Sequence, residues 1–117
     1  MKQIVLTLLL VTLSGCSALS LLPKKHDPVE VMYLVETKVA VDSLSCDNKD
    51  DSWDTAMVNA NLLAVYAAYR KEAQFENVKS IGDNLLKAKD NSVTCNAFLK
   101  VAQSRIDILY EAWGSRR

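Results

Sequence analysis

The chain has 117 residues, and its 14 Lys and Arg residues balance its 14 Asp and Glu residues, so the formal net charge at pH 7 is zero. This length suits one small domain with a single hydrophobic core. The balanced charge excludes a strongly basic surface for nucleic acid or for anionic lipid, so no nucleic-acid partner is expected.

The first 15 residues have the layout of a bacterial secretion signal. Lys2 is followed by an apolar segment from residue 4 to residue 13, and small residues come directly before Cys16. Secretion signals have this order of a charged start, an apolar middle and a small-residue cleavage site. The apolar segment is shorter than the roughly 20 residues that a spanning helix needs. We therefore expect residues 1–15 to be a signal peptide that is removed.

The sequence Leu13-Ser14-Gly15-Cys16 resembles the lipobox of bacterial lipoproteins. The resemblance implies that Cys16 carries a covalent diacyl lipid on its sulfur, and that its new amino group is usually acylated as well. Each buried CH₂ of the acyl chains contributes about 0.8 kcal/mol to anchoring. Ser17 resembles the outer-membrane class, which implies a domain that faces the periplasm. An ordinary signal peptide with a chance cysteine is the alternative.

Residues 16–27 are predicted to be a lipid-anchored tether, and residues 28–117 a helical domain. Two cysteines remain in that domain, Cys46 and Cys95. Exported cysteine pairs are most often disulfides, so we expect a bridge within the chain, with a bridge between copies as the alternative. A closed loop of about 50 residues stabilises a fold by roughly 4 kcal/mol. A metal site is not expected, because the one histidine, His26, lies in the tether.

The first predicted helix has a clear start. Asp27 is a capping residue, Pro28 suits the first helical position, and Glu30 stands where a capping box needs it. The helix is predicted to run to about Leu44. Its many β-branched residues make a strand the competing prediction.

The second predicted helix begins with Ser52 as its cap and ends at Arg70 and Lys71, where the helix dipole favours cations. Its apolar residues recur at helical spacing and predict one buried face. That face consists of Val58, Leu62, Val65, Tyr66 and Tyr69.

Two further helices are predicted in the second half of the chain. The third begins near Glu76 or Asn77 and ends at Asp90, and the fourth runs from the cap Ser92 to about Trp113. A seam of the fourth helix is predicted to face another helix, and it consists of Cys95, Phe98, Ala102, Ile106, Leu109 and Trp113. The predicted fold is all-α, a small bundle of about four helices stapled by one disulfide.

The predicted domain shows no recognisable set of catalytic residues. It contains no histidine, so Ser–His and Cys–His nucleophiles are excluded. Cys46 and Cys95 are too far apart for a CxxC redox motif, and the acidic loop at 47–54 lacks the calcium-loop spacing. We expect no enzyme, no metal and no cofactor besides the lipid. Glu30 and Glu36 are expected on solvated helix faces.

The first and fourth predicted helices are apolar beyond one face, which suits a partner helix. We therefore expect a protein-binding surface beside the fourth helix. Its candidate residues are Phe98, Leu99, Ile106, Leu109, Tyr110 and Trp113. The alternative is that the bundle core uses both apolar stripes.

The segment from Cys95 through Arg105 to Arg116, together with the lipobox, resembles the outer-membrane subunit of phage two-component spanins. That resemblance implies an inner-membrane spanin subunit as partner, and a pair of proteins that disrupts the host outer membrane at lysis. With only Pro23 and Pro28, the chain differs from the proline-rich type of that family.

The positions of Cys46 and Cys95 also resemble the layout of the helical pilotins of type II secretion. Pilotins are lipoproteins of about this length, with four helices, one disulfide, and a groove that holds a helix of the secretin and carries it to the outer membrane. The alternative partner is therefore a secretin. A structural or surface-exclusion lipoprotein is the third hypothesis.

Overall fold

The computed structural model describes residues 25–116. The predicted signal peptide, Cys16 and residues 16–24 of the tether lie outside the described residues, as does residue 117. The described part of the chain holds no helix that is long and apolar enough to cross a membrane.

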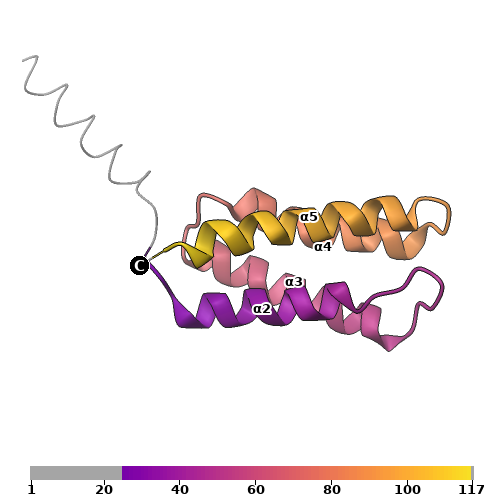
Figure 1. Cartoon of the computed structure of the whole chain (residues 1–117), viewed down its shortest axis with the longest axis horizontal. Coiled ribbons are helices and arrows are strands. Elements are labelled where there is room, and N and C mark those ends of the chain that lie inside the picture. The colour runs from indigo at the N-terminus through magenta and orange to yellow at the C-terminus, as the bar shows by residue number, and fades with distance from the viewer. Residues whose placement is uncertain (1–24, 117) are drawn as a thin grey trace, which may run out of the picture.

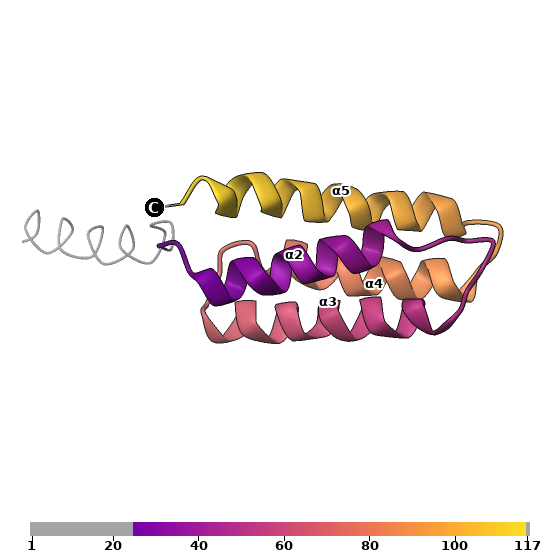
Figure 2. The same cartoon turned by 60° about the horizontal axis from the view of Figure 1, so that its bottom comes forward.

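Four helices form the described domain: α2 (Pro28–Asp42), α3 (Asp51–Tyr69), α4 (Phe75–Asp90) and α5 (Cys95–Gly114). Each helix packs on the next in the chain, and α5 returns beside α2, so the four surround one core (Figures 1 and 2). The start of α2 and the end of α5 lie at the same end of the bundle (Figure 1). This arrangement confirms the predicted all-α bundle.

The start of α2 follows the sequence prediction in part. The Asp27 carboxylate accepts a 2.9 Å hydrogen bond from the Val29 amide and a 3.4 Å bond from the Glu30 amide, so it caps the helix with Pro28 in the first turn. The Glu30 side chain, however, does not return to the cap. It is buried, with an exposed fraction of 1%, and the prediction of a solvated Glu30 is therefore wrong.

The boundaries of α3 differ slightly from the prediction. Asp50 caps the helix, not Ser52, because its carboxylate accepts a 2.9 Å hydrogen bond from the Ser52 amide. At the other end Lys71 adopts a positive φ of 55°. The Glu72 amide donates to the Ala67 carbonyl at 3.0 Å and the Lys71 amide to the Ala68 carbonyl at 3.1 Å, which is a Schellman motif.

The face of α3 that lies in the core is not the predicted one. The predicted face of large apolar residues is exposed except for the half-buried Tyr66. The core instead takes a face of mostly small residues, Trp53, Ala56, Ala60, Leu63 and Ala67. Small residues allow a close approach of the neighbouring helices, and they repeat at the same helical spacing as the large ones.

The second half of the bundle follows the prediction closely. The α4 residues Val78, Ile81, Leu85 and Ala88 are buried, and so is the predicted α5 seam, except that Leu99 takes the core position expected for Phe98. The turn before α5 is organised by Asn91 and not Ser92, because the Asn91 side chain accepts hydrogen bonds from the Val93 and Thr94 amides at 3.0 and 3.4 Å.

A disulfide joins Cys46 to Cys95, with a Cα–Cα distance of 6.0 Å. It links the loop after α2 to the first residue of α5, at the end of the bundle opposite the chain entry (Figure 2). The predicted intramolecular bridge is therefore confirmed.

Candidate functional site

The outward face of α3 carries a row of large apolar side chains. We call the residues Val58, Leu62, Val65 and Tyr69 the α3 stripe. Their exposed fractions are 58%, 45%, 60% and 81%. Their successive steps of 4, 3 and 4 residues place them along one line on the side of α3 opposite its buried face. The stripe is therefore solvent-facing apolar surface and takes no part in the core.

The stripe lies in a segment without charged residues. None of the 15 residues from Thr55 to Tyr69 is Asp, Glu, Lys or Arg. A helix that is apolar on all sides is normally buried on all sides, and a contiguous exposed apolar patch marks an interaction surface. In this bundle α3 is buried only on the side of its neighbours. The free side of α3 thus has the composition of a contact surface.

Aromatic rings extend this surface towards α2. The Tyr33 and Tyr66 rings are 5.5 Å apart in an edge-to-face arrangement, and the Tyr66 and Tyr69 rings are 6.2 Å apart. Edge-to-face aromatic pairs at such distances are favourable. The rings form an aromatic border at the chain-entry end of the stripe.

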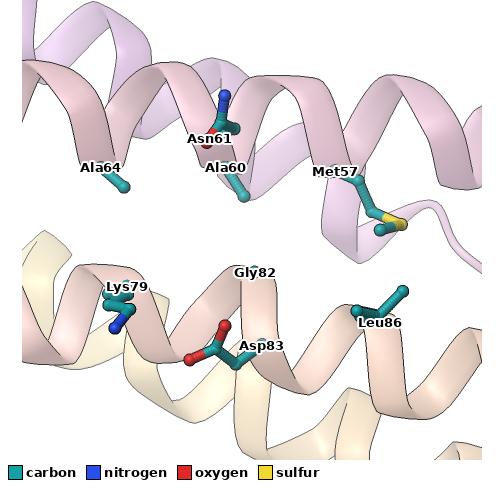
Figure 3. Close-up of a pocket in the computed structure, with 8 residues that line it drawn as sticks. All are labelled: Met57, Ala60, Asn61, Ala64, Lys79, Gly82, Asp83 and Leu86. Atoms are coloured by element: carbon teal, nitrogen blue, oxygen red, sulfur yellow. The ribbon is translucent and has the colours of Figure 1, made fainter.

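A shallow groove flanks α3 on its other side, towards α4 (Figure 3). Its volume is about 380 Å³, and Met57 and Leu86 project towards one another across it. A Cβ atom added at Gly82 would meet nothing within 4 Å, so this glycine is not required by close helix packing. The groove adds a small area of mostly apolar surface beside the stripe.

The residues predicted to bind a partner beside α5 occupy other places. Leu99, Ile106, Leu109 and Trp113 are buried in the core, and Phe98 is half-buried against it. Of the six, Tyr110 is the exposed side chain, with the Lys38 ammonium 6.0 Å from its ring. Four of these six residues therefore belong to the bundle core. The alternative, that the core uses both apolar stripes, does not hold for the outer side of α5, where Val101, Ile108 and Tyr110 are 39%, 50% and 50% exposed.

A buried cluster of charged side chains lies at the end of the bundle where the described chain begins. The Arg116 guanidinium is placed between two carboxylates from distant parts of the sequence. Its Nη1 donates to Glu30 Oε1 and to Glu72 Oε1, both at 3.0 Å, and its Nη2 donates to Glu72 Oε2 at 2.7 Å. The Glu72 side chain is fully buried and that of Arg116 is 11% exposed.

Arg70 extends the cluster to the start of the domain. Its Nη1 lies 2.9 Å from Asp27 Oδ2, and its Nη2 donates to the Lys25 carbonyl at 3.3 Å. The Tyr66 hydroxyl donates to Asp27 Oδ2 at 2.6 Å. This hydrogen bond is the main reason why the pKa of Asp27 is lowered and why the pKa of Tyr66 is raised to about 12.

The two glutamates of the cluster differ in their affinity for protons. Burial, the hydrogen bond with Glu72 and the charge of Glu72 raise the pKa of Glu30 from 4.5 to about 7. The pKa of Glu72 is lowered, because its hydrogen bonds with Arg116 and Glu30 outweigh the effect of burial. A shared proton therefore resides on Glu30 in mildly acidic solution.

Sequence reasoning did not find this cluster. Arg116 is 86 residues from Glu30 and 44 from Glu72, so no local spacing connects them. Glu72 belongs to the turn between α3 and α4, and Arg116 follows the end of α5. Only the fold brings them together.

Within residues 25–116, no group of three or more His, Cys, Asp or Glu side chains is arranged to hold a metal ion. No protein-family model matches the chain, and no curated protein or solved structure is significantly similar to it.

Proposed function

We propose that this chain is an outer-membrane lipoprotein, anchored through Cys16, whose helical domain binds a helix of a partner protein in the periplasm. The observation that carries the proposal is the α3 stripe, an exposed apolar row in a segment of 15 uncharged residues. An anchored domain without a catalytic set of residues is suited to binding.

The spacing of the stripe favours a helix as its occupant. Steps of 4, 3 and 4 residues are the spacing at which one helix packs a seam against another. Val58 and Tyr69, the two ends of the stripe, are 11 residues apart in the chain, which corresponds to about 17 Å along a helix at 1.5 Å per residue. A partner helix with two or three apolar turns at heptad spacing would cover the stripe.

Two observations support the anchored location. The lipobox ends at Cys16, and residues 16–24 connect it to Lys25, whose carbonyl is held by Arg70 at the chain-entry end of the bundle. The Cys46–Cys95 disulfide fits an oxidising compartment such as the periplasm. The stripe runs from Tyr69, at the chain-entry end of the bundle, to Val58 further along α3.

The partner that we propose first is the inner-membrane subunit of a phage spanin pair. Such a subunit would reach the outer membrane with a periplasmic coil, whose helices present apolar heptads. The resemblance of residues 95–116 and of the lipobox supports this choice. In this role the complex would disrupt the host outer membrane at lysis.

A secretin is the second candidate partner. A bundle of four helices with one disulfide between the loop after α2 and the start of α5 has the layout of a pilotin. The groove between α3 and α4 adds surface for a secretin helix. The protein would then carry the secretin to the outer membrane.

A pair of matched substitutions tests the surface. Leu62→Glu places a charge on the α3 stripe, where the side chain is 45% exposed. Ile108→Glu places the same charge on α5, where the side chain is 50% exposed and α3 makes no contact. Both variants should keep the helical content and melting temperature of the parent within a few degrees, because neither side chain belongs to the core.

The readout is capture of the partner from envelope membranes by the anchored protein, with identification by mass. We expect the Leu62→Glu variant to lose the partner and the Ile108→Glu variant to retain it. A single-span coil among the captured proteins would support the spanin assignment, and a secretin would support the pilotin assignment. Equal capture by both variants would refute binding through the stripe, and no partner at all would favour a structural or exclusion role.

A second test addresses the anchor. Cys16→Ser removes the sulfur that accepts the lipid, so the protein should move from the outer-membrane fraction to the soluble periplasmic fraction, and function should be lost. Ser20→Ala is the control, because it changes one side chain of the same predicted tether without touching the sulfur that accepts the lipid. A Cys16→Ser protein that stays on the membrane and keeps its function would contradict the lipoprotein assignment.

A further inference from the structure

The buried ion cluster has one acidic group more than its two arginines can neutralise. Asp27, Glu30 and Glu72 are the acids, and Arg70 and Arg116 are the bases. Glu30 Oε2 is buried without a hydrogen-bond partner among the described residues, and Arg70 Nε is 3.9 Å away from it. With Glu30 ionised, the cluster would contain an uncompensated buried negative charge, which is costly.

A proton on Glu30 removes this imbalance. The neutral carboxylic acid can donate to Glu72 while Arg116 continues to donate to both side chains. Two anions, Asp27 and Glu72, then face two guanidinium groups. The geometry and the burial of Glu30 therefore favour a closed cluster that contains one proton.

The cluster connects three separate parts of the fold. Glu30 is in the first turn of α2, Glu72 is in the turn between α3 and α4, and Arg116 follows α5. Arg70 extends these contacts to the Asp27 carboxylate and to the carbonyl of Lys25, which is the first described residue of the chain. Separation of these side chains would free both the start of α2 and the end of α5.

We propose that Glu30, Glu72 and Arg116 form a proton-controlled latch, which holds this end of the bundle closed while Glu30 carries a proton and loosens when that proton is lost. The groups that face Glu30 are all part of the cluster: Glu72 and Arg70 from the α3–α4 connection, Arg116 after α5, Asp27 before α2, and Tyr66 of α3. This inference is independent of the lipid anchor and of any partner.

Hydrogen exchange of two amides in the unmodified chain measures the opening. The Val31 amide donates to the backbone carbonyl of Asp27 at 3.0 Å in the first turn of α2, and the Arg116 amide donates to the backbone carbonyl of Trp113 at 3.2 Å. After correction for intrinsic exchange rates, opening at both amides should increase with pH by about tenfold per unit, the limit for one proton. The increase should level off above pH 7, near the pKa of about 7 for Glu30.

The controls separate the latch from general loosening. The Phe98 amide, which donates to the Thr94 carbonyl beside the disulfide, should open far less often than the two latch amides at pH 8, because the disulfide holds that end of the bundle. Glu30→Gln imitates the protonated acid, so its opening should be independent of pH between 5 and 8. His26→Gln should behave like the parent, which excludes the one histidine as the source.

The results that overturn the latch are equally definite. They are an increase that persists in Glu30→Gln, opening of the Phe98 amide as frequent as that of the two latch amides, or no pH dependence in the parent chain. A Glu30→Gln chain that does not fold at pH 8 would also overturn it, because the substitution keeps the shape and neutrality of the closed state.

Discussion

The guanidinium of Arg116 forms a two-pronged ion pair with the carboxylate of Glu72, at 3.0 and 2.7 Å, and closes the end of the bundle where the chain enters. The pair is largely withdrawn from solvent, since the side chains are 11% and 0% exposed. Two parallel hydrogen bonds fix the orientation of both groups. The stability of this end of the domain therefore depends on a pair of charges far apart in the sequence.

Removal of Arg116 should destabilise the domain strongly. Arg116→Met leaves Glu72 buried without its main partner, and an uncompensated buried charge typically costs about 3–5 kcal/mol. Lys38→Met is the control, because Lys38 forms exposed ion pairs with Asp42 and Asp107, and such pairs contribute at most about 1 kcal/mol. Urea denaturation at pH 7 compares the two variants. Similar losses in both would contradict the special role of the buried pair.

The domain should be less stable at neutral pH than in mild acid. The folded state raises the pKa of Glu30 from 4.5 to about 7, so the folded protein binds more protons than the unfolded chain between these values. The free energy of unfolding should therefore fall as the pH rises from about 4.5 to about 7, by up to about 3 kcal/mol, and then level off.

Below about pH 4.5 the free energy of unfolding should instead fall as the pH is lowered. The lowered pKa values of Glu72 and Asp27 mean that stability is lost as these groups are protonated in stronger acid. Denaturation curves between pH 3 and pH 8 should show a maximum near pH 5. Glu30→Gln should remove the decline towards neutral pH, whereas Glu36→Gln, an exposed position on the same helix, should preserve it. A parent protein that is most stable at pH 8 would contradict this account.

The sequence was sufficient to predict the four helices, because their caps and periodicity are local features. Asp27 and Pro28 marked the start of α2, and the spacing of Ala102, Ile106 and Leu109 marked the buried side of α5. The disulfide was predicted from the cysteine count in a chain that we expect to be exported. Cap positions were predicted less well, since several adjacent polar residues compete for them.

The two features on which our proposals depend, the α3 stripe and the ion cluster, were not predictable in the same way. Helix α3 has two apolar rows, one of large and one of small residues, and both repeat at helical spacing. The choice between them depends on how closely the neighbouring helices approach, which is a property of the whole bundle. The ion cluster depends on contacts across 44 and 86 residues, and no local pattern records them.

Loss of the disulfide should lower the free energy of unfolding by about 4 kcal/mol. The bridge joins residues 49 positions apart, and the chain-entropy estimate for a loop of this length gives about that value. Cys46→Ser with Cys95→Ser, compared with the oxidised parent by urea denaturation, measures it. Addition of a reductant to the parent should give the same loss and leave the double variant unchanged. A loss below about 1 kcal/mol would show that the bridge closes an already constrained chain.

A glycine at position 71 should stabilise the domain. Lys71 adopts a φ of 55° in the Schellman motif after α3, a region that costs side-chain-bearing residues about 1 kcal/mol relative to glycine. Lys71→Gly should therefore raise the free energy of unfolding by up to about 1 kcal/mol. Lys71→Ala, which removes the charge and retains the Cβ atom, should bring no gain. Equal gains in both variants would assign the effect to the charge and not to the backbone.

The proposed binding of a partner helix to the α3 stripe is tested most directly by photo-crosslinking in the cell envelope. A photo-reactive amino acid replaces Leu62 on the stripe in one strain and Ile108 on α5 in another, positions with exposed fractions of 45% and 50%. We predict one discrete crosslinked partner from position 62 and none from position 108. Crosslinks of the same yield and identity from both positions, or none from position 62 in envelopes that contain the anchored protein, would contradict binding through the stripe.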